Sequence, residues 1–160
     1  MQWAVGDTQW LIASLLMWFA SILLIGSMRG NPALPDPRAR SLAKQPARGV
    51  YAITRHPMMW SFAIWAGVHA LVNPTHPSII LSATIAFMAL VGAVGQDAKK
   101  RKLMGDSWKD WASRTSYLPF GRGFALPDGF ALIGGTILFF VVTWAHGALG
   151  YVTAGFWRWL

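Results

Sequence analysis

Long uncharged runs separated by basic segments dominate the chain. No residue between Thr8 and Met28 is charged, and this run is rich in Leu, Ile, Trp and Met. A second uncharged run covers residues 57–96, and a third extends from Gly129 to Trp157. A bilayer core requires roughly 20 apolar residues per helix. All three runs are therefore long enough to span a membrane as helices.

A short polar stretch at residues 73–77 divides the second run. It contains two prolines, which interrupt helices. We therefore expect a hairpin of two spans here, at about Pro57–Val72 and Ser78–Gln96. The pattern predicts an all-α fold for residues 1–160: a single domain forming a polytopic membrane helix bundle with about four transmembrane helices.

The two longer connecting segments, Arg29–His56 and Asp97–Asp128, contain nearly all of the Lys and Arg residues. Cytoplasmic loops of membrane proteins carry an excess of Lys and Arg. This distribution predicts that both segments are cytoplasmic and that both termini face outward. The first segment is rich in Pro and is expected to be irregular. In the second, the spacing of Leu103, Trp108 and Trp111 favours an amphipathic helix at the cytoplasmic interface.

Composition narrows the function classes. The chain has 14 Lys and Arg against 6 acidic residues, and 54% of its residues are hydrophobic. A basic balance can indicate nucleic-acid binding, but here the basic residues flank apolar runs, which favours a lipid bilayer as the partner and excludes nucleic acid. The absence of Cys excludes disulfides and thiolate ligands. Every acidic residue is an Asp expected in a loop or at a helix end, which disfavours hydrolases and pumps.

Two histidines, His69 and His146, fall inside predicted spans, where ionisable residues are rare and tend to be functional. A helical rise of ~1.5 Å per residue places them about 18 Å and about 25 Å from the cytoplasmic face, in the outer half of the bilayer. Two imidazoles on facing helices can ligate haem iron. Alternatively, each imidazole bonds a carbonyl or hydroxyl of a neighbouring helix. Residue types alone leave both interpretations open.

A third candidate site is formed by Arg55 and His56, directly before Pro57. Proline suits the first turn of a helix, so both side chains are expected at the cytoplasmic headgroup level. Arginine there can bind an anionic ligand or a lipid phosphate. The alternative is an ordinary basic anchor at the membrane edge.

An ordered set of motifs resembles the signature of the NnrU family over nearly the whole chain. The matching residues are Arg48–Trp60, Trp65, His69, Gln96, Asp97, Lys99–Lys102, Arg114–Tyr117, Pro119 and Phe120. NnrU proteins are proteins of the bacterial inner membrane, associated with nitrite and nitric oxide reduction. Their domain is similar to 15-cis-zeta-carotene isomerase of plants and cyanobacteria, a membrane enzyme that contains haem b.

The resemblance implies that His69 is a ligand of haem b and that the substrate is an apolar polyene undergoing cis–trans isomerisation. In the isomerase a Cys precedes this His by three residues, whereas this chain has Ala66. Ligand switching through a Cys is therefore excluded. Family members usually have about two further spans, with another ligand histidine, before the point where this chain begins. Either the chain lacks those spans, or His146 substitutes as the ligand, or no haem is bound.

Two other functions remain open. One is a non-enzymatic subunit or accessory protein that binds another membrane protein. The other is methyl transfer from S-adenosylmethionine, because isoprenylcysteine and phospholipid methyltransferases share the Arg55-His56-Pro57 element. Those enzymes have a downstream acidic pair, whereas this chain reads Gln96-Asp97. The sequence assigns no catalytic residue.

Overall fold

The computed structural model describes residues 3–160, and within them it contains helices but no named strand. The all-α prediction is therefore confirmed. The helices in chain order are α1 (Asp7–Ser27), α2 (Ala39–Lys44), α3 (Val50–Ile53), α4 (Pro57–Val72), α5 (His76–Met104), α6 (Asp106–Arg114), α7 (Gly129–Ala148) and the 3-10 helix η1 (Gly155–Trp159).

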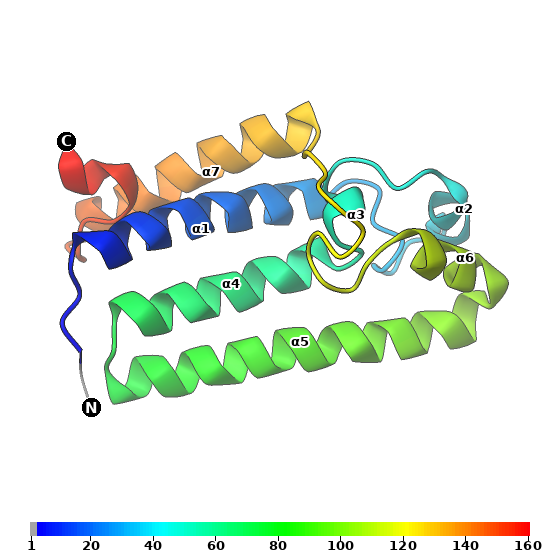
Figure 1. The fold of residues 1–160 in the computed structure, drawn as a ribbon, viewed down its shortest axis with the longest axis horizontal. Helices are drawn as coiled ribbons and strands as arrows, with labels where there is room; N and C mark the ends of the chain where they lie inside the picture. The colour runs from blue at the N-terminus through cyan, green and yellow to red at the C-terminus, as the bar shows by residue number, and fades with distance from the viewer. Residues whose placement is uncertain (1–2) are drawn as a thin grey trace.

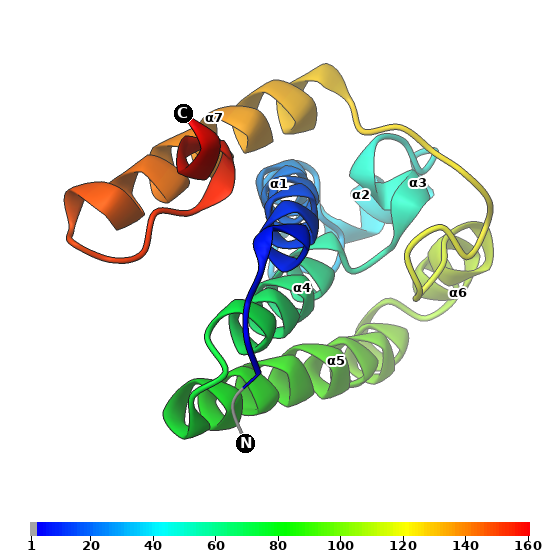
Figure 2. The same cartoon turned by 60° about the vertical axis from the view of Figure 1, so that its left-hand side comes forward.

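The four longest helices lie side by side in the order α7, α1, α4, α5 (Figure 1). Turning the molecule shows that this row is curved, with α5 and α7 at its two edges (Figure 2). Apolar side chains such as Phe87 on α5 and Ile133 on α7 are exposed at these edges. An apolar exposed surface suits lipid, because lipid tails need no protein cover.

Three helices, α1, α5 and α7, are long and apolar enough to cross a membrane. The fourth predicted span, α4, has 16 residues, which corresponds to about 24 Å of helix, less than the ~30 Å of a bilayer core. The link before α4 is buried within the protein, with Thr54 0% and His56 2% exposed. Irregular backbone is tolerated at membrane depth when protein surrounds it, so a short central helix is compatible with a spanning domain.

The two ends of the row differ in chemistry. Both chain termini lie at one end, which we call the terminal end (Figure 1). The segments at residues 28–56 and 105–128, which contain most of the Lys and Arg residues, lie at the opposite end, which we call the basic end. The sequence predicted that the two basic loops share a side, and they do. That this side is the cytoplasm stays a prediction.

Helices α2, α3 and α6 form a small cap at the basic end. The predicted helix around Trp108 is confirmed as α6, but its Trp108 and Trp111 side chains are 0% and 2% exposed and pack in the protein's own core. Leu103, assigned to the same face, belongs to α5 and is exposed. Arg114 donates to the Ala43 carbonyl at 2.6 Å and so ties α6 to α2. Helix α2 also adds order to a segment that was expected to be irregular.

Helix α5 continues eight residues past its expected end at Gln96, because no helix breaker occurs before Gly105. Lys and Arg are good helix formers, and Gly105 ends the helix with a positive φ of 58°. The expectation that every Asp lies in a loop or at a helix end is therefore wrong for Asp97, which lies inside α5. Helix α7 ends earlier than expected, at Ala148, and the chain folds back so that Trp157 donates to the Phe140 carbonyl at 3.2 Å.

Candidate functional site

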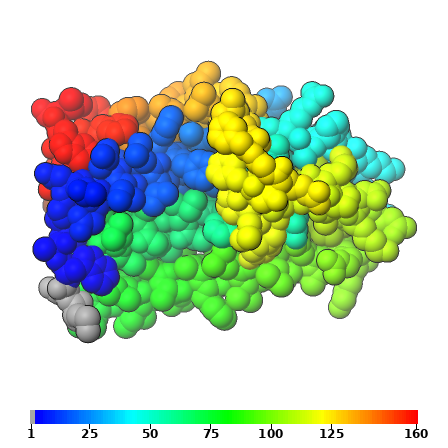
Figure 3. All heavy atoms as spheres, viewed as in Figure 1, coloured from blue at the N-terminus to red at the C-terminus, as the bar shows by residue number. Residues whose placement is uncertain are grey.

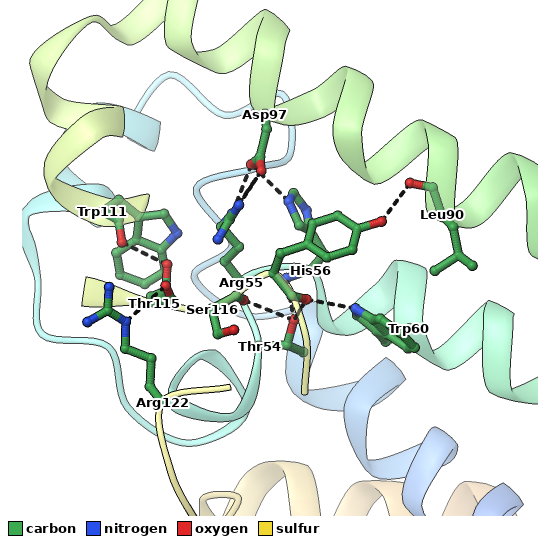
Figure 4. Close-up of polar contacts among 11 residues, drawn as sticks. Thr54, Arg55, His56, Trp60, Leu90, Asp97, Trp111, Thr115, Ser116 and Arg122 are labelled. Carbon is green, nitrogen blue, oxygen red and sulfur yellow. Dashed lines mark hydrogen bonds and ion pairs between the residues drawn. The ribbon is translucent and has the colours of Figure 1, made fainter. Parts of the chain in front are cut away.

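A buried polar cluster at the basic end joins α4 to α5 (Figure 4). Asp97, on α5, accepts hydrogen bonds from Arg55 Nε at 3.0 and 2.9 Å, and a further bond from Arg55 Nη2. His56 Nε2 lies 2.9 Å from the other side of the same carboxylate. We call Arg55, His56 and Asp97 the polar clamp.

The polar clamp is largely shielded from solvent. The side chain of His56 is 0% exposed, and those of Arg55 and Asp97 are 14% and 12% exposed. Because a carboxylate only accepts hydrogen bonds, the proton between His56 and Asp97 lies on Nε2 of the imidazole. The other ring nitrogen, Nδ1, is buried and makes no hydrogen bond within residues 3–160.

The connection from α6 to α7 covers the polar clamp and runs across the face of the molecule in Figure 3 (yellow). Its Tyr117 ring packs edge-on against His56 with centroids 5.7 Å apart, and its hydroxyl donates to the Leu90 carbonyl at 2.8 Å. Burial raises the pKa of the Tyr117 hydroxyl, and the negative charge of Asp97 raises this pKa further. Tyr117 therefore remains a neutral hydrogen-bond donor that links this connection to α5.

Arg55 and His56 were predicted to bind an anionic ligand or cofactor at the headgroup level. The structure brings them together, but Asp97 occupies the hydrogen bonds of Arg55 Nε and His56 Nε2. A bound anion would have to compete with that carboxylate. Ligand binding by Arg55 and His56 stays a prediction, whereas their role in joining two helices follows directly from the geometry.

A cavity of ≈ 760 Å³ lies between α1, α4 and α7 and extends to the residues that follow α7. It falls within the size range of small-molecule and cofactor sites. Its walls are mostly apolar, and the two intramembrane histidines, His69 from α4 and His146 from α7, both line it. Two side chains 77 positions apart in sequence, by their residue numbers, therefore share one cavity.

Both histidines are held in the same tautomer by their own helices. His69 Nδ1 lies 2.8 Å from the Trp65 carbonyl, and His146 Nδ1 lies 2.7 Å from the Val142 carbonyl. A carbonyl oxygen only accepts, so Nδ1 carries the proton and Nε2 keeps a free lone pair. Histidines that bind metal typically donate their other ring N–H in this way. The His69 ring also stacks on Trp65 at a centroid distance of 3.9 Å.

The cavity matches the needs of haem better than those of a metal ion held by protein alone. Haem supplies four nitrogen ligands of its own and takes one or two axial ligands from the protein, frequently His. The two Nε2 atoms suit that role. Within residues 3–160 there is no group of three or more His, Cys, Asp or Glu residues that could hold a metal ion without a porphyrin.

Sequence reasoning missed the importance of two residues, Asp97 and Tyr117, which it noted only as parts of a motif. A signal for Asp97 was present, since it is the single acidic residue between a long apolar run and a run of Lys and Arg. No comparable signal marked Tyr117, whose position depends on the path of the connection after α6.

Comparison with known proteins identifies one family. The family model described as NnrU protein matches residues 1–154, which is nearly the whole chain. No curated protein and no solved structure matches the chain.

Proposed function

The chain belongs to the NnrU family, and from this premise we propose that it is a membrane protein that binds haem b in the cavity between α1, α4 and α7. His69 and His146 are the proposed axial ligands. The observation that carries the proposal is the pair of Nε2 lone pairs at one cavity, each fixed by an Nδ1 hydrogen bond to its own helix.

The proposed reaction is the cis–trans isomerisation of an apolar polyene. Bound haem would supply ferrous iron, which can interact with a cis double bond and lower its barrier to rotation. The chain's own contribution is to orient and to exclude water. The cavity wall on α1 runs from Trp10 to Leu24, about 21 Å at the helical rise, and that length suits a rod-shaped apolar molecule lying along the helices.

The topology is part of the proposal. With the basic end in the cytoplasm of a bacterial cell, the cavity lies in the outer half of the inner membrane. A haem-carrying subunit without isomerase activity is the second candidate. The exposed apolar edges at α5 and α7 favour it, because a membrane protein partner can pack there as lipid does. Loss of isomerisation with retention of haem in a complex would favour this candidate.

The visible spectrum tests the proposal. Purified after expression with ample haem, the protein is expected to show a Soret band, whereas His69→Ala is expected to bind haem at least about tenfold more weakly because an axial ligand is gone. His146→Ala should lose a ligand in the same way, and low-spin bands of the two-histidine form should disappear.

His76→Ala is the matched control, since His76 is exposed at the start of α5 and lines neither cavity described for this chain. Its spectrum should equal that of the unaltered protein. A colourless protein with correctly folded helices would refute haem binding, and an unchanged spectrum in His69→Ala would refute the assigned ligand.

A further inference from the structure

A second cavity of ≈ 290 Å³ lies between α4 and α5 at the terminal end. It shares Trp65, His69 and Asn73 with the larger cavity. Because the Trp65 and His69 rings stack on each other at 3.9 Å, this pair forms a partition with one cavity on each side. The smaller cavity is called the side chamber below.

The side chamber differs from the larger cavity in its polar lining. Asn73, Thr75, Ser78 and Ser82 all contribute to its wall. Thr75 and Ser78 take part in hydrogen bonds at the start of α5, where Thr75 Oγ1 accepts from the Ser78 N–H at 3.4 Å. The Ser78 hydroxyl in turn lies 3.4 Å from the His69 carbonyl, so the wall of the side chamber is joined to α4 directly behind the His69 ring.

Ser82 is the most informative of these residues. Its side chain is buried, with 3% exposure, and its hydroxyl makes no hydrogen bond within the described part of the chain. Other hydroxyls on the long helices donate to the carbonyl four residues earlier, as Thr84 does to Ile80 at 2.9 Å and Thr143 to Phe139 at 2.7 Å. A buried hydroxyl without a partner is unfavourable in apolar surroundings, so the Ser82 hydroxyl calls for a partner inside the side chamber.

Water is the smallest molecule that satisfies this hydroxyl. A water occupies about 30 Å³ in the liquid and needs two to four polar partners in a protein cavity. The side chamber is large enough for several waters, and its four polar residues supply the partners. The apolar walls of the larger cavity offer far fewer.

We propose that the side chamber is a hydrated binding site for small polar, hydrogen-bonding molecules, which enter it from the terminal end and reach the Trp65–His69 partition without passing through the apolar cavity. Ser82 and Asn73 are the residues that bind such a molecule. The proposal goes beyond haem binding and does not depend on it, because it rests on the lining of the side chamber and on the unpartnered Ser82 hydroxyl.

Cysteine labelling tests the proposal, and the absence of native Cys makes the chain well suited to it. Ser82→Cys differs from the native residue by one atom. In lipid nanodiscs, the reagent is 2-sulfonatoethyl methanethiosulfonate, which is charged and does not enter the bilayer. The thiolate attacks the sulfur of the reagent, a disulfide forms and methanesulfinate leaves, so only a hydrated thiol that can ionise reacts.

Thr84→Cys is the matched control because Thr84 lies two residues further along α5 and is exposed on the apolar surface of that helix. Ser82→Cys is expected to react at least about tenfold faster than Thr84→Cys, since a thiol in apolar surroundings stays protonated. Equal rates in the two variants, whether slow or fast, would overturn the proposal, provided that both variants elute and melt like the unaltered protein.

Asn73→Cys provides a second site in case Ser82→Cys disturbs the packing of α4 and α5. Asn73 is exposed at the end of α4 and lines the side chamber. Its thiol is expected to react quickly, and prior reaction there should slow the labelling of Ser82→Cys in the double variant, because the attached group fills the side chamber. Independent labelling of the two thiols would show that they do not share one hydrated space and would overturn the proposal.

Discussion

Asp97→Asn is expected to destabilise the protein by about 3–5 kcal/mol, the range for breaking one partner of a buried ion pair. The Asn side chain keeps the size of Asp97 but removes the charge that Arg55 and His56 share. Arg55, with its side chain 14% exposed, would then remain buried and uncompensated between α4 and α5. Thermal or denaturant unfolding in detergent, followed by circular dichroism, measures the effect.

Asp36→Asn is the control for this substitution. Asp36 pairs with Arg38 at 3.0 Å, but the Arg38 side chain is 76% exposed, and exposed pairs contribute about 0–1 kcal/mol. The double variant Arg55→Leu/Asp97→Leu removes both charges and should recover much of the lost stability. If Asp97→Asn and Asp36→Asn had equally small effects, the polar clamp would not be a buried ion pair in the membrane-embedded protein.

Gly135→Ala is expected to cost about 3 kcal/mol or more, at the upper end of the range for overpacking a close-packed contact. Gly135 lies on α7 against α1, and a Cβ there would come within 2.6 Å of the Ile22 backbone nitrogen. Backbone atoms in a helix cannot move aside as a flexible side chain can. The two helices must therefore separate, which would also widen the cavity that they line.

Gly92→Ala on α5 is the matched control, because a Cβ at Gly92 meets nothing within 4 Å. Alanine is the better helix former, so this variant should be unchanged or stabilised by up to about 1 kcal/mol. Comparing the unfolding midpoints of the two variants under one set of conditions checks the prediction. A Gly135→Ala protein as stable as Gly92→Ala would mean that α1 and α7 are not packed at backbone contact.

Much of the fold could be predicted, because runs of uncharged residues and two prolines locate the long helices. Helix ends were less accessible to sequence reasoning. The Lys and Arg residues after Gln96 were interpreted as a loop, although charged residues continue a helix readily once it has left the apolar layer. The side-by-side order of the helices depends on close approaches such as that of Gly135 to Ile22, which no local pattern encodes.

The candidate site was accessible in part. His69 and His146 stood out because imidazoles are rare inside apolar spans, but their common cavity depends on α1 lying between α4 and α7. The polar clamp was less accessible, because Arg55 and Asp97 are 42 positions apart. Nothing in either segment alone indicates that the two side chains meet.

The place of α7 in the row affects how the protein is built in the membrane. Helices α1, α4 and α5 contact one another in sequence order, so they can pack while the ribosome is still synthesising the rest of the chain. The wall that contains His146 is synthesised last and docks on α1, the first helix to be made. The larger cavity therefore exists only after translation is nearly complete, and any large ligand must be loaded after insertion and not during it.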